Sequence, residues 1–327
     1  MNCTVIYGGF NPAWRAGQFE RELVDSLVTS VNKQYPNLKK IVAVTSWHEP
    51  SLLVEQIKEI DADITFLCSL TDPLGPIENF VEQLPGQVEL VGYVDSEWYY
   101  DFWAVACSKF FKKYNNQELE SANFKYLFLN YNRKPHRHRI ELVNLLETSG
   151  LVDYGCVTLG NSKYTVNDQT ANYKEHGAND VVGDVGIPND VYSLGQLEIW
   201  NQSLVNIVSE TQFEFGPNVF LSEKIWKPII GLRPFVINGS PGIYRLLKRA
   251  GFDCFEDLFP VDVLGDENFN NDWKFNNHKH IVESLTRLKD NDLLEIYNQL
   301  RPRLLRNQQL FYEYASNQSI NFKFKIR

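Results

Sequence analysis

Short apolar runs alternate with amphipathic stretches along most of this chain. In the first third, the runs at residues 3–7, 40–44, 64–67 and 88–94 predict strands, and the stretches 18–31, 52–60 and 99–114 have helical spacing. Strands joined by helices favour parallel pairing with right-handed crossovers. The pattern therefore predicts an α/β fold for this part of the chain.

The same alternation resumes near residue 124 and predicts a second α/β unit. A strand at 126–129 and a helix through 140–146 are expected first, followed by a helix at 194–200 and a strand at 205–208. A helix capped by Ser222, a strand at 234–237 and a helix at 243–250 ended by Gly251 come next. Residues 156–195 are rich in Asn, Gly and Asp and predict loops around a site. Amphipathic helices are expected at 280–288 and 292–310, with Pro302 breaking or starting one.

Length and composition indicate a two-domain globular protein. The chain has 327 residues, and the polar segment 115–123 is the candidate linker between two domains. A hydrophobic content of 43% with 22% charged residues is typical of soluble globular proteins. The net charge of −9 excludes a global attraction to nucleic acid or anionic lipid, but it allows a local basic patch.

Cysteine usage and the N-terminal sequence bear on the compartment. The five cysteines are scattered and lack C-x-x-C spacing, which predicts free thiols in a reducing environment and no zinc site. No signal-like segment opens the chain, and no stretch reaches the length of a membrane span. The protein is therefore expected to be cytoplasmic. His278 and His280 lack a third metal ligand and are expected at the surface.

Three polar residues fall where a parallel α/β sheet binds ligands. Glu210 follows the strand at 205–208, and Glu223 and Lys224 occupy the first turn of the helix capped by Ser222. Ligands of open α/β sheets bind outside the carboxyl ends of the strands. A lysine in the first turn opposes the helix dipole unless an anion lies nearby. The alternative is a surface helix start with an ordinary acid and an exposed lysine.

Cationic side chains crowd the turn between the strand at 126–129 and the next helix. Besides Lys134 and two histidines, the turn carries Arg133, Arg137 and Arg139. Helix N-termini and arginine forks are good diphosphate sites. The run therefore predicts an anion-binding site, with a solvated charge run as the alternative.

The segment 205–255 also resembles a known family. Its Ser222-Glu223-Lys224 triplet, followed by an aromatic residue and a proline-bounded apolar strand, looks like the donor-binding motif of the α1,3-fucosyltransferases and is similar to exostosin-type glycosyltransferases. Glu210 takes the place of an acidic residue before the motif, and the chain departs from the family at Lys227-Pro228. The resemblance implies that Glu223 binds the ribose, that Glu210 faces the sugar or the ribose, and that Arg137 or Arg139 contacts phosphate.

The resemblance further implies the GT-B fold, in which two Rossmann-like domains face a central cleft. We expect an N-terminal acceptor domain at residues 1–118, a nucleotide-sugar donor domain at 119–300, and a C-terminal helix within 301–327 that returns towards the first domain. Lys224, the arginines and a helix N-terminus can stabilise a leaving diphosphate, so no metal or other cofactor is expected. The expected reaction is inverting transfer from a GDP- or UDP-sugar to a glycan or other hydroxyl acceptor.

An inverting transferase needs a base for the acceptor hydroxyl, and the first domain is expected to supply it. Glu49, in the segment S-W-H-E-P-S, resembles the E-S/N-P segment that carries the base in fucosyltransferases. Asp95 and Glu97 also end a strand beside aromatic residues that suit sugar stacking. Glu49 is the first choice among these three candidates.

Other interpretations stay open. Asp95-Ser96-Glu97 is similar to the D-x-D metal motif of single-domain GT-A enzymes, and Glu214 with Glu223 is similar to the paired glutamates of retaining GT-B enzymes. The chain is alternatively a glycosyltransferase that modifies hydroxymethylated DNA bases, with nucleic acid as acceptor only, or a non-catalytic nucleotide-binding module. The aromatic cluster at 98–103 suits base stacking as well as sugar stacking, or belongs to the core.

Overall fold

The chain forms two compact units, and each is described here by itself. In the computed structural model, unit 1 comprises residues 1–102, 181–187 and 319–327, and unit 2 comprises 103–180 and 188–318. The structure describes the backbone of 2–8, 40–46, 64–69, 88–94, 181–182, 187–188, 271–275 and 324–326. With side chains it describes 29, 33, 104, 107, 108, 116–120, 123–132, 135–159, 194–195, 197–210, 213, 221–240, 242–259 and 276–317.

Unit 1 contains a five-stranded sheet in the order β1-β2-β3-β4-β11. The strands β1 (Asn2–Gly8), β2 (Lys40–Ser46), β3 (Ile64–Ser69) and β4 (Val88–Val94) are parallel, as the sequence predicts. The last strand, β11 (Phe324–Ile326), pairs antiparallel with β4. A two-stranded sheet joins β7 (Val181–Val182) to β8 (Ile187–Pro188).

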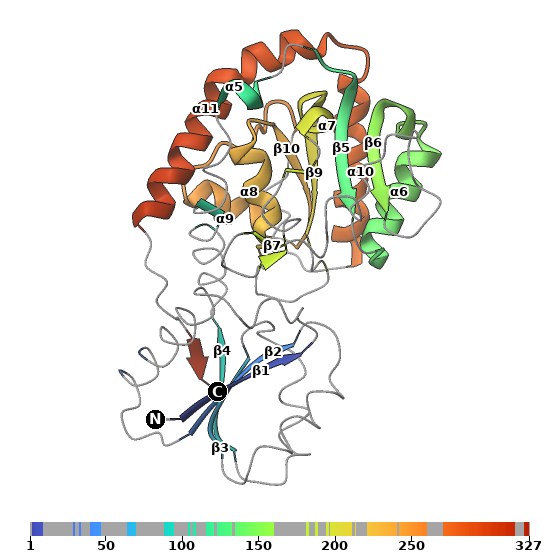
Figure 1. Cartoon of the computed structure of the whole chain (residues 1–327). Coiled ribbons are helices and arrows are strands. Elements are labelled where there is room, and N and C mark those ends of the chain that lie inside the picture. The colour runs from blue at the N-terminus through green and yellow to red at the C-terminus, as the bar shows by residue number, and fades with distance from the viewer. Residues whose placement is uncertain are drawn as a thin grey trace. The chain divides into compact units, whose positions relative to one another are not determined.

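Unit 2 is built on a parallel four-stranded sheet in the order β10-β9-β5-β6 (Figure 1). Its strands are β5 (Tyr126–Asn132), β6 (Gly155–Leu159), β9 (Ser203–Ser209) and β10 (Phe235–Asn238). The chain adds β6 on one side of β5 and then β9 and β10 on the other. The strand order therefore reverses between β5 and β9, which is the topological switch point of a doubly wound sheet.

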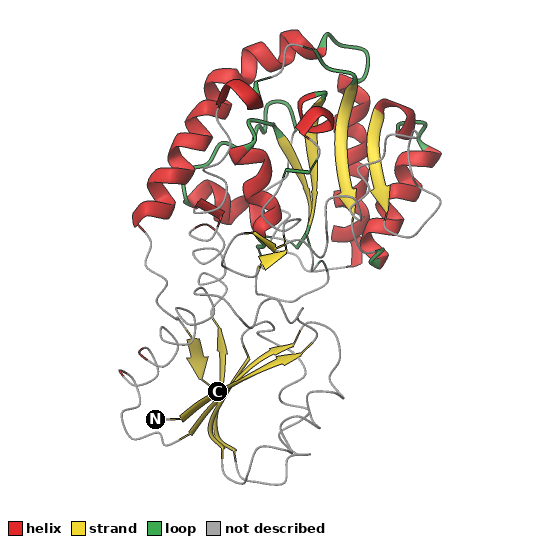
Figure 2. Cartoon of the chain, in the orientation of Figure 1, coloured by secondary structure: helices red, strands yellow, loops and turns green. Residues whose placement is uncertain are grey.

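Helices cover both faces of this sheet (Figure 2). α6 (Arg137–Thr148) connects β5 to β6, and α10 (Asn271–Leu288) packs against α6, β5 and β10. α8 (Glu223–Ile230) connects β9 to β10 and packs against α11 (Leu293–Asn317). Right-handed crossovers running in opposite directions place α6 and α8 on opposite faces. The described part of unit 2 also contains α5 (Asn116–Leu119), α7 (Leu197–Asn201), α9 (Ile243–Arg249) and the 3-10 turn η3 (Val152–Tyr154).

Apolar side chains fill the layer between α8 and α11. The Trp226 ring lies 5.1 Å from Phe311 and 5.6 Å from Phe252, measured between centroids, and Trp226 and Phe311 are fully buried. Each strand of the unit 2 sheet is buried almost throughout, as expected for a parallel sheet with helices on both faces. This packing fixes α8 against α11.

The observed division of the chain differs from the expected one near residue 118. Residues 116–119 form α5, and Leu119 is fully buried in unit 2, so this part of the expected linker belongs to a packed unit. The helix expected to return to the first domain, α11, belongs to unit 2, whereas the final strand β11 belongs to unit 1. Long-range burial and strand pairing decide these assignments, and neither leaves a local sequence pattern.

Two local predictions were wrong. Residues 155–159, expected mostly as loop, form the buried edge strand β6. Pro302 neither breaks nor starts a helix, because it lies inside the continuous α11. A proline removes one backbone hydrogen bond from a helix interior, and the buried Leu300, Leu304 and Phe311 supply packing on either side of it.

The structure describes the side chains of three of the five cysteines. Cys107, Cys156 and Cys254 are free and buried. Burial raises the pKa of the Cys156 thiol to about 11 and that of Cys254 to about 12. Neither thiol therefore ionises readily at neutral pH. None of the helices in the described part of the chain has the length and apolar character needed to cross a membrane.

Candidate active site

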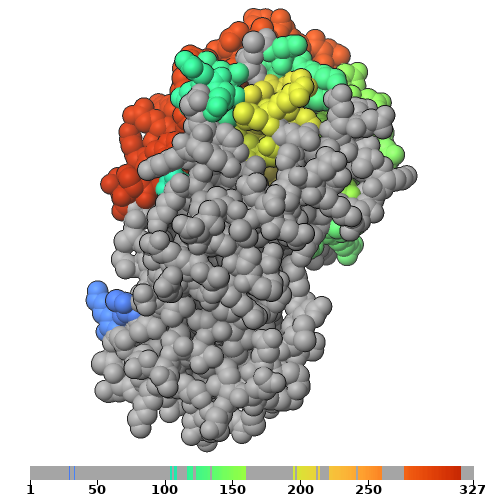
Figure 3. Space-filling model, in the orientation of Figure 1, coloured from blue at the N-terminus to red at the C-terminus, as the bar shows by residue number. Residues whose placement is uncertain are grey.

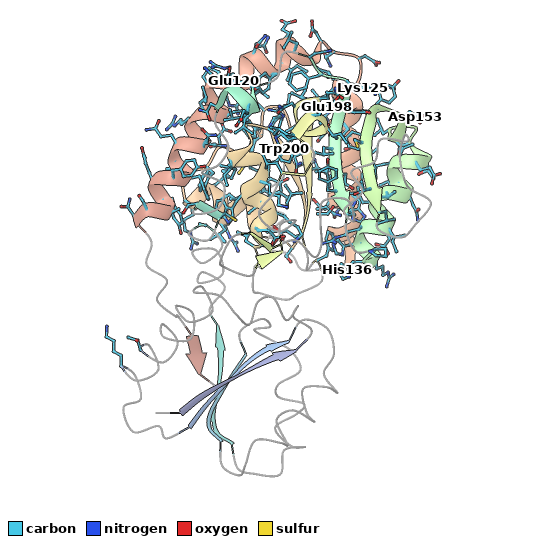
Figure 4. The ribbon with its side chains drawn as sticks, in the orientation of Figure 1. Glu120, Lys125, His136, Asp153, Glu198 and Trp200 are labelled. Carbon is cyan, nitrogen blue, oxygen red and sulfur yellow. The ribbon has the colours of Figure 1, made fainter. Side chains whose placement is uncertain are left out.

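Polar side chains gather at the carboxyl edge of the unit 2 sheet. Asn132 ends β5, Ser209 ends β9 and is followed by Glu210, and Asn238 ends β10 in register with Ser209. All four are 0–2% exposed. Figure 4 shows His136, just before α6, at the end of unit 2 opposite Lys125, which precedes β5. The edge includes the switch point between β5 and β9, where open α/β sheets bind ligands.

The start of α8 is fixed to the end of β9 through Ser222 and Glu210. Ser222 caps the helix, because its hydroxyl accepts a hydrogen bond from the Lys224 backbone N–H at 3.3 Å. The same hydroxyl donates to Glu210 Oε2 at 2.6 Å, and the Ser222 backbone N–H lies 3.4 Å from Glu210 Oε1. The cap expected from the sequence is confirmed, and Glu210 is the group that orients it.

The Lys224 ammonium contacts one carboxylate and one hydroxyl of this turn. Its Nζ atom lies 2.7 Å from Glu223 Oε1 and donates to Ser222 Oγ at 3.2 Å. The Lys224 side chain is 25% exposed and that of Glu223 is 11% exposed. The turn therefore presents one cation that is held in place by two neighbours and still reaches the solvent.

The pKa values of the two glutamates move in opposite directions. Burial raises the pKa of Glu210, and the Lys224 charge and the Ser222 hydrogen bond offset this only in part. Burial also acts to raise the pKa of Glu223, but the charges of Lys224 and Lys227 outweigh it and the net shift is downward. Glu223 is thus the carboxylate held in its ionised form beside Lys224.

Two residues of the cationic segment, His138 and Arg139 in the first turn of α6, hold the end of β9. The Arg139 guanidinium is 3% exposed, and its Nη2 donates to the carbonyls of Glu210 and Ser209 at 2.9 and 3.2 Å. His138 Nε2 lies 2.9 Å from the same Glu210 carbonyl. The sequence suggested that an anion compensates these positive charges. In the structure, the carbonyls at the end of β9 compensate part of the charge of Arg139. A phosphate contact by Arg139 stays a prediction.

The other arginines of this turn are placed differently. Arg137 is exposed, with its side chain 80% exposed, and forms an ion pair of 2.8 Å with Glu141 one helical turn later. Its role in phosphate binding also stays a prediction. Arg133 lies outside the described residues.

The sequence did not single out a group of amides and rings at the same edge. Asn130 Nδ2 donates to the Ile207 carbonyl at 3.0 Å and to Ser209 Oγ at 3.1 Å, and Asn132 Nδ2 donates to Asn130 Oδ1 at 2.6 Å. On β10, Asn238 Oδ1 lies 3.0 Å from His278 Nε2. Asparagines at the ends of apolar strands were the available signal: Asn130 is the third residue from the end of β5, and Asn132 and Asn238 are the last residues of β5 and β10.

His278 corrects a sequence-based expectation. It is 5% exposed rather than at the surface, because α10 packs on the sheet and turns this face of the helix inward. The centroid of its ring lies 5.4 Å from that of Phe213, and the centroid of the Phe213 ring lies 5.1 Å from that of His138. These three rings pack beside the buried asparagines, and the His278 ring contacts Asn238 directly.

His138 should make the free energy of unfolding depend on pH. Burial lowers its pKa from 6.5 to about 3, against the opposing hydrogen bond to Glu210. The unfolded chain then binds more protons than the folded one between these values, so stability is lost as pH falls through this window. Lowering the pH from 6.5 to 5.5 should cost about 1 kcal/mol through this residue.

Urea titrations of the wild type and of His138→Gln at both pH values measure this contribution. The Gln variant keeps an N–H donor and should lose less stability on acidification. Glu210, whose pKa is raised, contributes a pH dependence of the opposite sign, but it is common to both proteins and cancels in the comparison. Equal losses in both would show that His138 titrates normally in the folded protein.

The three candidate bases, Glu49, Asp95 and Glu97, lie outside the described residues, and their role stays a prediction. Ser222, Glu223, Lys224 and Glu210 are brought together as expected. Within the described ranges, no three His, Cys, Asp or Glu side chains are grouped to hold a metal ion. The described residues of this edge offer the partly exposed Lys224 ammonium at a capped helix N-terminus, beside an ionised carboxylate and a set of buried amides.

Comparisons with protein-family models, with curated proteins and with solved structures found no match to this chain.

Proposed function

We propose that this protein is a glycosyltransferase that moves a sugar from a GDP- or UDP-sugar to a hydroxyl acceptor. The proposal includes an inverting, metal-independent reaction, a GT-B arrangement of two Rossmann-like units, and a donor site in unit 2. The acceptor is a glycan or another hydroxyl compound, and its base is expected among Glu49, Asp95 and Glu97.

One observation carries the proposal. The Ser222-Glu223-Lys224 turn begins α8 at the carboxyl edge of a doubly wound sheet, next to the switch point, and Glu210 anchors it. Helix N-termini at this edge bind phosphate groups through backbone N–H groups and the helix dipole. Lys224 adds a positive charge where charge develops on a leaving diphosphate. Glu223 adds an ionised acceptor suited to a ribose hydroxyl.

A donor screen tests the proposal. Melting temperatures are measured with GDP-, UDP-, CMP- and dTDP-sugars, since a ligand that binds only the folded protein raises its stability. A rise with GDP- or UDP-sugars alone is expected. The absence of a rise with any nucleotide sugar, at concentrations up to several millimolar, would contradict the proposed function.

Nucleotide binding is further predicted to be metal-independent. The predicted diphosphate contacts come from Lys224, nearby arginines and a helix N-terminus, and these carry the charge that a cation would otherwise supply. The measurement is calorimetric titration with the nucleoside diphosphate selected by the screen, in EDTA and in magnesium or manganese. Affinities within about twofold of each other are expected, and loss of binding in EDTA would favour the metal site at Asp95-Ser96-Glu97 instead.

A further inference from the structure

Asn132 carries a buried acceptor that has no hydrogen-bond partner among the described residues. It is the last residue of β5, at the switch point, and it is 0% exposed. Its backbone N–H donates to Thr158 Oγ1 at 3.1 Å and its Nδ2 donates to Asn130, but in the part of the chain that the structure describes nothing pairs with its Oδ1. Buried polar atoms are almost always paired, so an unpaired one at a ligand-binding edge requires an explanation.

The neighbouring amide determines which atom of Asn132 is left over. The Ile207 carbonyl can only accept a hydrogen bond, so the Asn130 atom facing it at 3.0 Å must be the NH2 group. Asn130 therefore presents its oxygen to Asn132, which must answer with its own NH2 at 2.6 Å. The atom of Asn132 without a partner is thus the oxygen, independently of how similar amide nitrogen and oxygen look.

We propose that Asn132 Oδ1 is a ligand subsite that accepts a hydrogen bond from a neutral O–H or N–H group of the nucleoside part of the donor. This inference rests on the proposed function. A carbonyl oxygen repels phosphate oxygens, so the subsite does not bind the diphosphate and complements the Lys224 ammonium. Its position at the switch point is where nucleotides bind in doubly wound sheets. Asn132 therefore recognises the nucleoside part of the donor, and Lys224 recognises the negative charge of its diphosphate.

The test separates the two parts of the ligand. Asn132→Leu keeps the branching of the side chain, removes the acceptor and also loses the hydrogen bond that Nδ2 donates to Asn130. Affinity for the nucleoside diphosphate found in the donor screen should fall about tenfold, as expected for one lost hydrogen bond in a desolvated site. Affinity for inorganic pyrophosphate should stay within twofold of the wild type.

Asn307→Leu is the matched control. Asn307 is also buried, but both of its amide atoms are paired with the Asp253 backbone, at 2.9 and 2.8 Å. This variant should lower the melting temperature more than Asn132→Leu does and leave nucleotide affinity unchanged.

Ligand analogues identify the donor group: 2′-deoxy and 3′-deoxy nucleotides test the ribose hydroxyls, and a change of base tests the base N–H groups. The analogue that lacks the donor group should bind the wild type about tenfold more weakly than the parent nucleotide does. In Asn132→Leu, that analogue and the parent nucleotide should bind with equal affinity.

The outcomes distinguish this inference from the function on which it rests. If the wild type binds neither nucleotide nor pyrophosphate, the proposed function is wrong. If it binds nucleotide and Asn132→Leu retains that affinity within twofold, a water molecule satisfies Oδ1 and the inference is wrong. Should Asn132→Leu fail to fold, the wild type alone decides, because equal affinity for the parent nucleotide and for every analogue would overturn the subsite.

Discussion

Lys224→Ala should weaken nucleoside diphosphate binding by about 10–150-fold, which corresponds to the 1.5–3 kcal/mol of a charge-assisted hydrogen bond. The ammonium is 2.7 Å from Glu223 and 3.2 Å from Ser222, at a capped helix N-terminus. A phosphate arriving there gains the lysine charge, the dipole of α8 and backbone donors together. Removing Lys224 leaves the Glu223 carboxylate with less compensating positive charge, so it repels the same phosphate more strongly. Both effects act in the same direction on affinity.

Lys248→Ala is the matched control for this prediction. Lys248 also forms a 2.8 Å ion pair with a glutamate, Glu256, but on the surface and away from α8. Its replacement should leave affinity unchanged in calorimetric titrations run beside those of Lys224→Ala, with circular dichroism to verify folding. A folded Lys224→Ala protein with the affinity of the wild type would place the phosphate elsewhere.

Arg233→Met should lower the free energy of unfolding by about 3–5 kcal/mol, because several buried carbonyls lose their donor at about 1–3 kcal/mol each. Arg233 is 1% exposed and donates to the carbonyls of Ser203 at 2.9 Å, Leu119 at 3.0 Å and Leu232 at 2.8 Å. Its guanidinium carbon also lies 5.3 Å from the centre of the Tyr297 ring. Burial lowers the pKa of Arg233 to about 10, so it stays charged at neutral pH.

These contacts join separate elements of unit 2. Through Leu119, Asn201 and Tyr297, Arg233 connects α5, α7 and α11, whose surfaces lie close together in Figure 3. Loss of the side chain leaves buried carbonyls without donors, and methionine can replace only the apolar contacts.

Arg303→Met provides the comparison for Arg233. Arg303 forms paired hydrogen bonds of 2.6–2.9 Å with Asp253 and Asp257, but its side chain is 31% exposed and Asp257 is 67% exposed. Ion pairs open to solvent contribute at most about 1 kcal/mol. Urea unfolding of both variants measures the two effects. A smaller loss in Arg233→Met than in Arg303→Met would contradict this account of the buried network.

The parts of unit 2 that depend on local sequence were predicted well. The strands at β5, β9 and β10 follow from short apolar runs, and Ser222 caps α8 as its sequence indicates. Gly251, expected to end α9, has a φ of 90°, a left-handed conformation that favours glycine. Each of these features is set by residues within a few positions of one another, so the sequence contains the necessary signal.

The parts that depend on distant contacts were missed. Whether His278 is buried depends on α10 packing over β10, forty positions away in sequence from its partner Asn238. Arg139 was expected to bind an anion. In the structure it donates hydrogen bonds to the carbonyls of Ser209 and Glu210, which lie 70 and 71 positions later in the sequence. The amide of Asn132 became a candidate only when its neighbours were known atom by atom. The polarity of a side chain is visible in a sequence, whereas its partner is not.

A crystal structure with bound nucleoside diphosphate tests the donor site most directly, through the distance from Lys224 Nζ to the nearest phosphate oxygen. The proposal predicts a hydrogen bond of about 2.7–3.2 Å, with the phosphate at the N-terminus of α8 and Lys224 turned from Glu223 towards it. A nucleotide bound elsewhere, with Lys224 still paired to Glu223 as it is now at 2.7 Å, would contradict the central claim.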